Sequence, residues 1–415
     1  MSPSSKWTKV ALGAAVALSC FDHAAAQAVG WSGAADTDWN NTANWVGGIV
    51  PPTGGGPFSV CLFITNHLGY PLYYTAAQGS TIFYNGTGVG SSRPLRIAAD
   101  GTSRTGALYI TGGILESRGA NGDVIGNLAN SYGALVVAGG VYIHTNQALL
   151  FGNSGARAAL TINSGTALVS TIDARNTVTG EINVTGGRLI MDRIVTNGTI
   201  RLVLTIDGGT LQSRSVQSSW MPNNVDIRVG TNGAVVSTSG GNVGLGAPIS
   251  GIGGLIKTDD NTLTLSGANT YEGVTVVAKG VLSVANNSAL GSTAQGTEIR
   301  SGAILSLQNG VAVTGETVRI VGNGDNYGAI QAAANSTSVW NGPVLLDSNA
   351  GPWSPRIGTG ANGVLTVAGP IMNGNTGSHA YFSGNGTTGR VILTTNSSYT
   401  EIGRASCRER VCELV

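Results

Sequence analysis

Short runs of alternating apolar and polar residues, each closed by glycine, recur along most of the chain. The five clearest runs occupy 108–110, 135–137, 160–162, 182–184 and 204–206. Alternation with a period of two is typical of a β-strand with one buried face, and the glycines permit positive φ or close backbone approach at the turns. The runs begin at intervals of 27, 25, 22 and 22 residues, and weaker copies stand at 282–284, 305–307 and 365–367.

This near-constant interval predicts an all-β fold, a right-handed parallel β-helix or related β-solenoid in which each interval is one turn. One turn buries too few apolar side chains to offset the entropy lost on ordering its backbone, so stability must come from stacking on neighbouring turns. No stretch outside the N-terminal segment has helical periodicity, which argues against crossover helices. A β-sandwich is the second candidate, although its turns do not return one pattern at a constant interval.

Residues 253–291 carry the most detailed pattern in the chain. Its recurring positions are Gly253, Gly254, Leu255, Leu263, Leu265, Gly267, Asn269, Tyr271, Gly273, Gly280, Leu282 and Val284. The pattern resembles the autotransporter-associated β-strand repeat of bacterial passenger regions, and the resemblance implies a solenoid associated with export of the passenger. It departs from that repeat at Asp259, Asp260 and Asn261, where the family has a glycine-containing turn; Asp and Asn can also form such a turn.

A second, truncated copy of the repeat is predicted within residues 369–400, where Val391, Leu393 and Tyr399 reproduce the spacing of two leucines and the tyrosine in the first copy. The last residues, 401–415, resemble a translated sequencing adapter. They crowd three Arg, three Glu and two Cys into a chain that is otherwise sparsely charged, and we expect them to be an artefactual tail.

The N-terminal residues 1–26 are predicted to be a signal peptide, because Lys6 and Lys9 precede an apolar run that ends in an Ala-x-Ala site. The rest divides by pattern into four parts. These are an irregular Trp- and Tyr-rich capping region (27–104), solenoid turns (105–250), the repeat (251–291) and further turns with the truncated copy (292–400).

Composition restricts the partners. Charged residues are 10% of the chain, and five of the 22 basic and four of the 21 acidic residues lie in the two terminal segments, which leaves 17 of each sign. No basic patch supports binding to nucleic acid or to an anionic membrane surface. Membrane association is therefore expected only through a missing C-terminal anchor or barrel.

Cys61 is the one cysteine between the terminal segments, so no disulfide within that part is expected.

Three tryptophans, Trp31, Trp39 and Trp45, stand in a Gly- and Asn-rich frame near the predicted mature start. They could cover the open edge of the first turn, which would otherwise invite pairing with another strand. They could instead form a platform on which sugars stack. We favour the cap, because large aromatic side chains more often fill space than bind a ligand.

Candidate chemistry is sparse. His67, His144 and His379 are far apart in the sequence and form no zinc motif, so a surface or turn position is expected for each. The acids Asp173, Asp192, Asp207 and Asp226 are spread over several turns; Asp173 with Arg175, and Asp192 with Arg193, are expected to be solvated pairs. We predict no catalytic residue, no metal site and no cofactor.

The favoured interpretation is a non-enzymatic, exported bacterial passenger region: a structural or adhesin-like β-solenoid at the cell surface, associated with the outer membrane, or extracellular. Its expected partners are glycans or proteins of a host or of the cell surface. One alternative is a glycan-active β-helix enzyme, a polysaccharide lyase or hydrolase that uses the scattered acids. The other is a secreted carbohydrate-binding protein built on the tryptophans.

Overall fold

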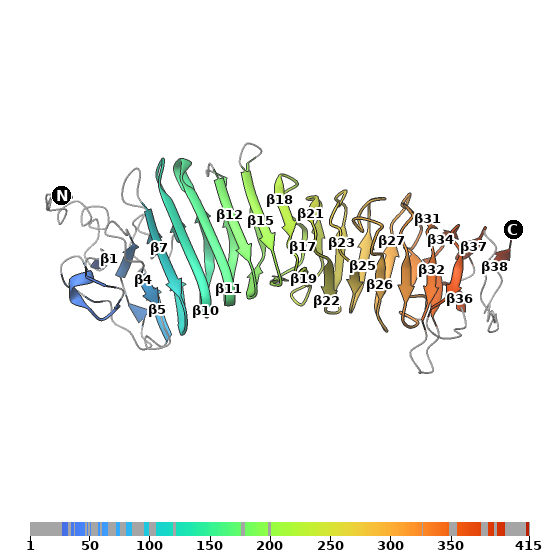
Figure 1. Ribbon diagram of the computed structural model, residues 1–415, viewed down its shortest axis with the longest axis horizontal. Helices are drawn as coiled ribbons and strands as arrows, with labels where there is room; N and C mark the ends of the chain where they lie inside the picture. Colours follow the sequence, from blue (N-terminus) through green and yellow to red (C-terminus); the bar gives the residue numbers. More distant parts are fainter. Residues whose placement is uncertain are drawn as a thin grey trace, which may run out of the picture. The chain divides into compact units, whose positions relative to one another are not determined.

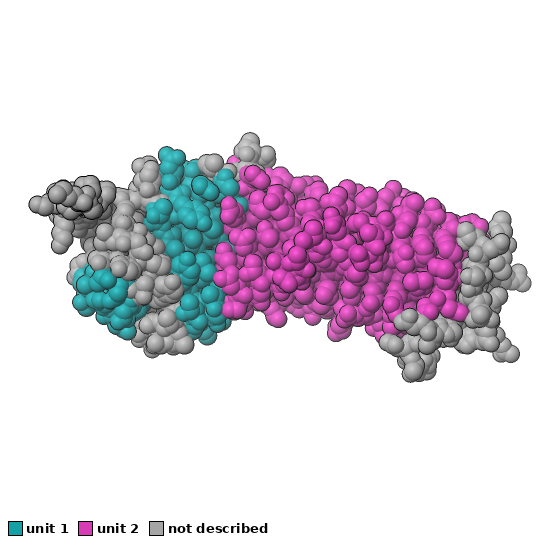
Figure 2. Space-filling view, viewed as in Figure 1, with its two compact units in different colours: residues 1–160, 168–180 teal, residues 161–167, 181–415 magenta. Residues whose placement is uncertain are grey.

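The computed structural model describes the chain in segments. The described residues are 27–31, 35–36, 38–45, 48, 50, 57–58, 60–64, 72–74, 80–84, 95–98, 105–118, 122–175, 179–197, 201–325, 327–347, 355–374, 381–385, 388–394 and 412–414. They fall into two compact units, one of residues 1–160 and 168–180 and one of residues 161–167 and 181–415 (Figure 2). Strands β11 (Arg157–Asp173) and β12 (Thr179–Val184) divide between the units.

The first unit contains three parallel ladders that all meet one long strand. The first ladder joins β1 (Gln27–Trp31), β3 (Val60–Ile64), β6 (Leu95–Ile97) and β9 (Val124–Ile125). The second joins β2 (Pro57–Phe58), β5 (Ser80–Tyr84) and β8 (Ile114–Arg118), and the third joins β4 (Leu72–Tyr74) and β7 (Thr105–Ile110). Two short 3-10 turns, Thr42–Asn44 and Asn153–Gly155, interrupt the strands.

Strand β10 (Tyr132–Phe151), labelled in Figure 1, has 20 residues and pairs with the last strand of each of these three ladders. It pairs in turn with β7, β8 and β9, so a single strand makes a whole turn of the solenoid. The chain bends at Gly139 and Gly140, where a Cβ on Gly140 would lie 2.6 Å from the Ile110 Cγ2 of the turn below. The glycine pair is therefore required by close approach, although the pattern predicted a strand end there.

The second unit carries four parallel ladders. The first joins β12, β15 (Arg201–Ile206), β18 (Val225–Val229) and β21 (Ile249–Gly251). The second joins β13 (Arg188–Met191), β16 (Thr210–Ser213), β19 (Ala234–Ser237), β22 (Leu255–Thr258), β24 (Thr275–Val277), β26 (Thr297–Ile299), β29 (Val318–Ile320), β32 (Val344–Leu346) and β35 (Ile371–Asn373). Strand β14 (Arg193–Val195) also belongs to this unit.

The third ladder joins β17 (Gln217–Met221), β20 (Val243–Leu245), β23 (Thr262–Leu265), β25 (Val281–Val284), β27 (Ile304–Leu307), β30 (Ile330–Ala332), β33 (Arg356–Ala361) and β36 (Tyr381–Asn385). The fourth joins β28 (Ala312–Thr314), β31 (Thr337–Asn341), β34 (Val364–Val367), β37 (Arg390–Leu393) and β38 (Cys412–Leu414).

Inward-facing side chains stack from turn to turn and make the core. In the first unit Leu135 lies over Leu108 and Val137 over Ile110, and all four are fully buried. In the second unit Leu263, Leu282 and Leu305 form such a column. Each buried aliphatic side chain contributes about 1.5–3 kcal/mol by leaving water, and here each leaves water only because the next turn covers it.

The predicted all-β parallel solenoid is confirmed. Every pairing between named strands that the described residues make is parallel, whereas a sandwich requires antiparallel sheets. The run at 135–137 lies above the run at 108–110. The ends of the runs at 160–162, 182–184 and 204–206 also stack, because the amide of Thr185 donates to Ile162 O (2.9 Å) and the amide of Asp207 donates to Val184 O (2.9 Å).

Two details of the structure differ from the predicted division of the chain. Residues 27–104 are not only a cap, because β1 to β6 already belong to parallel ladders. Val391 and Leu393 of the predicted second copy lie on the β28–β38 ladder, whereas the leucines they were matched with lie on the β17–β36 ladder. Cys412–Leu414 of the adapter-like tail pairs with β37. The predicted signal peptide, like Tyr399, lies outside the described residues.

Within the described ranges, no helix has the length and apolar character needed to cross a membrane.

Candidate functional site

The most patterned stretch, 253–291, is built of two successive turns rather than one. Its strands β22 and β23 pair with β24 and β25 of the same stretch, so that Leu255 lies beside Thr275 and Leu263 beside Leu282. Leu255 and Thr275 are 20 positions apart, which makes this turn shorter than those near the N-terminus. The pattern therefore specifies the contact between two successive turns, because it includes the residues that both turns bring to that contact.

The apolar and glycine positions of the pattern serve that interface. The buried aliphatic positions are Leu255, Leu263, Leu265, Leu282 and Val284. Gly253, Gly254, Gly267 and Gly273 lie where a Cβ would meet backbone of the neighbouring turn, 1.8 Å from Gly230 O in the case of Gly253. Gly280 adopts a positive φ of 67°.

Asn269 connects three consecutive turns. Its Oδ1 accepts from the amide of Ile249 (2.9 Å) on the turn below, and its Nδ2 donates to Ala289 O (2.6 Å) on the turn above. Its own amide donates to Ser288 O (3.0 Å). Because Asn269 is buried, each of these bonds satisfies a group that has no access to water.

Tyr271 is buried with its hydroxyl 2.5 Å from Thr275 Oγ1, and that threonine hydroxyl donates to Leu290 O (3.2 Å). Burial raises the pKa of Tyr271 above its ordinary value, so the phenol stays neutral. The tyrosine fills the interior at the turn and presents no reactive group to solvent.

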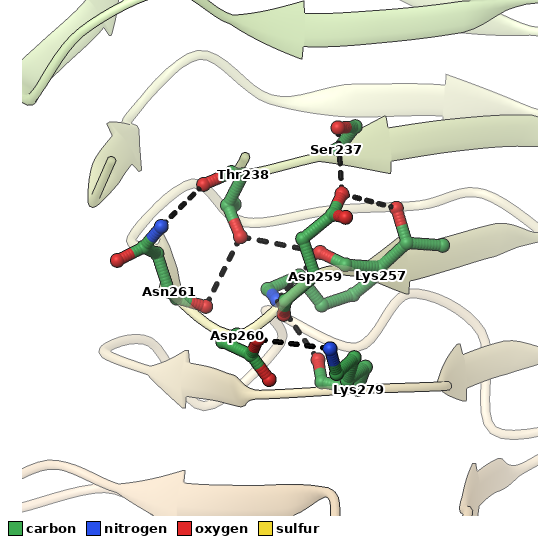
Figure 3. Close-up of polar contacts among 8 residues, drawn as sticks. Ser237, Thr238, Lys257, Asp259, Asp260, Asn261 and Lys279 are labelled. Atoms are coloured by element: carbon green, nitrogen blue, oxygen red, sulfur yellow. Dashed lines mark hydrogen bonds and ion pairs between the residues drawn. The ribbon is translucent and has the colours of Figure 1, made fainter. Parts of the chain in front are cut away.

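Lys257 is a buried lysine at the end of β22, surrounded by carbonyl groups (Figure 3). Its Nζ donates to Thr258 O (2.8 Å), Asp259 O (2.7 Å) and Lys279 O (2.9 Å). Burial lowers its pKa to about 8, an effect that the nearby Asp259 and Asp260 carboxylates oppose. The ammonium ties two successive turns together through their backbone.

The turn at 259–261 shows how Asp replaces the glycine of the family pattern. Asp259 adopts a positive φ of 67°, and its Oδ2 accepts from Ser237 Oγ (2.6 Å) and Thr258 Oγ1 (3.0 Å) (Figure 3). The bond from Ser237 lowers the pKa of Asp259, which keeps the carboxylate charged. Asp260 forms an exposed ion pair with Lys279 (2.8 Å).

The three tryptophans are packed together within the first unit. Trp31, Trp39 and Trp45 are 1–3% exposed, and Trp45 meets the other two edge to face with ring centroids 5.0 Å apart. Trp45 Nε1 donates to Trp39 O (2.6 Å), and Asn44 beneath accepts from the amides of Ala35 (2.9 Å) and Asp36 (3.0 Å). Buried indole faces are unsuited to stacking on sugars, so this geometry favours the packing role.

His144 is not at the surface or in a turn, contrary to our expectation. It is fully buried on β10, with Nδ1 3.2 Å from Ser117 O and 3.5 Å from Asp123 Oδ2. Asp123 also accepts from Ser117 Oγ (2.7 Å) and Tyr142 OH (2.6 Å). Alternation along β10 turns residues 142 and 144 inward, which a lone His in the sequence did not reveal. The group is closed to substrates and works as an internal polar network. His67 and His379 lie outside the described residues.

The scattered acids have separate partners. Asp173 pairs with Arg175 (2.6 Å) as expected, but Asp192 pairs with Arg214 (2.5 Å) of the next turn instead of Arg193. Asp207 accepts from the amide of Asn232 (2.7 Å), and Asp226 pairs with Arg228 (2.5 Å). The described part of the chain brings no three His, Cys, Asp or Glu side chains together in a group able to hold a metal ion.

Glu316 is a buried acid that the sequence did not single out. Its Oε1 accepts from Thr297 Oγ1 (2.7 Å), and among the described residues no group is within hydrogen-bonding reach of its buried Oε2. Burial raises its pKa to about 7. The Thr-Gly-Glu-Thr sequence around it reads as an ordinary turn, so only the fold reveals that the side chain points inward.

Comparison with known proteins agrees with this geometry. The sequence profile of the passenger-associated-transport-repeat family matches residues 255–284. This stretch is a passenger-associated transport repeat. In structural terms the transport repeat is the pair of turns formed by β22 to β25, with Lys257 and Asn269 between them.

A curated relative extends the similarity beyond the transport repeat. The chain is 31% identical over 127 residues to the adhesin BmaC autotransporter of Brucella suis biovar 1 (strain 1330). The match covers 31% of this chain and 4% of the adhesin, so the chain spans a small part of that protein's length. No solved structure matches the chain.

Proposed function

We propose that this chain is a segment of an exported bacterial passenger, a non-catalytic β-solenoid that displays adhesive surface at or outside the cell. The observation that carries this proposal is the use of the transport repeat's patterned side chains. Its buried leucines, Asn269 and Lys257 make contacts between turns, Tyr271 is buried with its hydroxyl bonded to Thr275, and none of these side chains faces solvent. The similarity to an autotransporter adhesin supports the same function.

The transport repeat is also proposed to assist export. Two turns that stack on each other form a local unit with short sequence separation, and such a unit can order before longer-range contacts form. A segment that folds early and outside the cell would favour forward movement of the chain. This proposal rests on the matched family's description and on the pairing of β22 with β24.

Adhesion tests the main proposal directly. Beads coated with the folded full chain are incubated with cultured animal cells, and beads coated with the same chain after irreversible heat unfolding are the control. We expect several-fold more folded-chain beads to remain after washing. Equal retention of the two bead types contradicts the adhesin function.

Activity assays address the enzyme alternative. The full chain is incubated with pectin, mucin and neutral glycans, and new reducing ends or unsaturated products are measured. We expect none above the buffer control. Turnover that is lost in Asp173→Ala, Asp192→Ala or Asp207→Ala would instead establish a glycan-active enzyme.

A further inference from the structure

Six Asn-Gly pairs lie within the part of the chain that the structure describes. Asparagine is among the thermolabile residues of proteins, and a following glycine, which has no Cβ, leaves its amide nitrogen open to approach by the asparagine side chain. The pairs begin at Asn232, Asn309, Asn323, Asn341, Asn362 and Asn373. The two residues are identical in all six pairs, so the hydrogen bonds that the fold imposes distinguish them.

Five of these pairs have a peptide group that a backbone hydrogen bond holds in place. The carbonyl of the asparagine and the amide of the glycine belong to one planar group, so a bond to either one opposes rotation of both. The fifth pair is held through its carbonyl, because Asn341 O accepts from the amide of Gly315 (2.8 Å). The other four are held through the glycine amide: Gly233 donates to Gly230 O (3.0 Å), Gly310 to Thr337 O (2.9 Å), Gly363 to Gly360 O (3.0 Å) and Gly374 to Leu346 O (2.7 Å).

Asn323 and Gly324 form the sixth pair, in the connection between β29 and β30. In the described structure the side-chain amide and the carbonyl of Asn323 have no hydrogen-bond partner, and neither has the amide of Gly324. Asn323 is partly exposed, so water has access to it. Of the six peptide groups, this one can therefore turn its nitrogen toward the side-chain carbon without breaking a hydrogen bond.

We propose that Asn323 is a site of spontaneous deamidation in the folded protein. The amide nitrogen of Gly324 attacks Cγ of Asn323, the new N–Cγ bond closes a cyclic imide, and the Cγ–Nδ2 bond breaks. Nδ2 leaves as ammonia with the proton that the Gly324 amide gives up. Water then opens the imide at one of its two carbonyl groups, which yields aspartate or an iso-aspartyl linkage.

The iso-aspartyl product does not fit this connection. A Cβ on Gly324 would lie 2.5 Å from Ala329 Cα and 2.5 Å from Gly328 O, so the backbone here is already tightly packed. Ala329 joins neighbouring turns, because its amide donates to Arg356 O (2.9 Å) and its carbonyl accepts from the amide of Leu305 (2.7 Å). The iso-aspartyl linkage adds one methylene to the backbone directly before Gly324. We therefore expect it to displace Ala329 and weaken both bonds.

Peptide mapping by mass spectrometry measures the conversion at each pair. The folded full chain is incubated at pH 8, and a second sample is incubated in guanidinium chloride, where the fold holds none of the pairs. We expect Asn323 to convert several-fold faster than each of the other five asparagines in the folded chain, and the six rates to converge in the denaturant. Conversion of Asn323 at the rate of the others in the folded chain, or an equal advantage in the denaturant, overturns the proposal.

Variants locate the reaction. Asn323→Gln, whose longer side chain closes an imide much more slowly, is expected to remove the fastest of the six conversions. Asn309→Gln is the matched control, at a pair that the bond from Gly310 holds, and is expected to leave the conversion at Asn323 unchanged. A methyltransferase specific for iso-aspartyl carboxyl groups labels the product. If the peptide that contains residue 323 carries as much label in Asn323→Gln as in the wild type, the proposal is overturned.

The converted chain tests the effect on packing. It carries an additional carboxylate and is separated from unconverted chain by anion exchange before the other pairs convert. We expect its iso-aspartyl form to unfold at a lower urea concentration than the unconverted chain. Asn323→Asp adds the same charge without the extra backbone atom and is expected to unfold at the wild-type midpoint. Equal midpoints for the iso-aspartyl form and Asn323→Asp overturn the inferred effect on packing.

Discussion

Three buried polar side chains of the second unit differ in how fully they are hydrogen-bonded. Lys257 and Asn269 are tied to backbone groups of neighbouring turns, and each of their bonds replaces one that water would have made. Glu316 is different, because only one of its carboxyl oxygens is bonded within the described structure. A buried carboxyl group in that position is more stable protonated than charged.

The pKa of Glu316 yields a prediction about pH. The fold raises this pKa from its ordinary 4.5 to about 7, so the stability that the protonated carboxyl contributes is fully present below pH 4.5 and is lost as the pH rises through 7. The variant Glu316→Gln removes this dependence. At pH 8 we expect its free energy of unfolding to exceed that of the wild type by up to roughly 3 kcal/mol, and at pH 4.5 to equal it.

Urea midpoints at pH 4.5, 6 and 8 measure the difference between the two proteins. Glu298→Gln is the control, since Glu298 is partly exposed and pairs with Arg300 (3.0 Å) at the surface. A Glu316→Gln midpoint below that of the wild type at pH 8 would show that the carboxylate is stabilised in the fold, contrary to this account.

Turns between strands, rather than the strands themselves, determine how closely neighbouring layers can stack. The glycine pairs that follow the short apolar runs illustrate this, because the second glycine of the pair lies against a β-branched residue of the layer below. A Cβ on Gly140, Gly187 or Gly209 would come within 2.4–2.6 Å of such a side chain. The sequence pattern located these glycines, but it could not decide between positive φ and close approach as their cause.

The variant Gly209→Ala tests whether close approach of the neighbouring turn is the reason for glycine at this position. Its Cβ would lie 2.5 Å from both Val184 Cγ1 and Val184 O, and backbone cannot move aside cheaply. We expect a loss of about 2–3 kcal/mol by overpacking. The comparison variant is Gly302→Ala, where φ is +78° and no atom lies within 4 Å of the added Cβ, so that only the backbone penalty of about 1 kcal/mol applies. Equal urea midpoints for the two variants would contradict close approach as the cause at Gly209.

Replacing Asn269 tests how much its hydrogen bonds between turns contribute to stability. Asn269→Ala leaves the Ile249 amide and Ala289 O unpaired in the interior, and we expect a loss of about 2–4 kcal/mol. Asn287→Ala is the matched control, because this exposed asparagine makes one bond to the next turn, from the Ala312 amide (2.9 Å), and water can replace it. A loss in the control as large as that in Asn269→Ala would mean that burial does not decide the effect.

At the scale of the whole molecule, the fold class could be predicted from the sequence, but the assignment of strands to ladders could not. Period-two runs at near-constant intervals required stacked parallel turns, and the leucines of the transport repeat were recognisable as core. The interval alone could not show that β10 makes a whole turn without a break, or that Val391 and Leu393 lie on a different ladder from Leu263. His144 and Glu316 were missed for a related reason: whether a polar residue points inward depends on where the chain bends, which the alternation does not specify.

Stability in such a molecule belongs to the stack, so a whole turn should be removable if register is kept. Thr297 lies above Thr275 as its strand partner, and residues 275–296 therefore make one turn of 22 residues. Deleting them lets β26 take the place of β24 on β22. We expect the protein to keep its β-sheet circular dichroism and to unfold at a lower urea concentration, because it loses one interface between turns.

Deleting one residue more, 275–297, places Glu298 at the buried position of Thr275 and turns Ile299 outward. That variant is expected to lose its sheet signal or aggregate. If both deletions are tolerated equally, inward and outward alternation does not specify the stack, and if both fail alike, the turns are not separable layers.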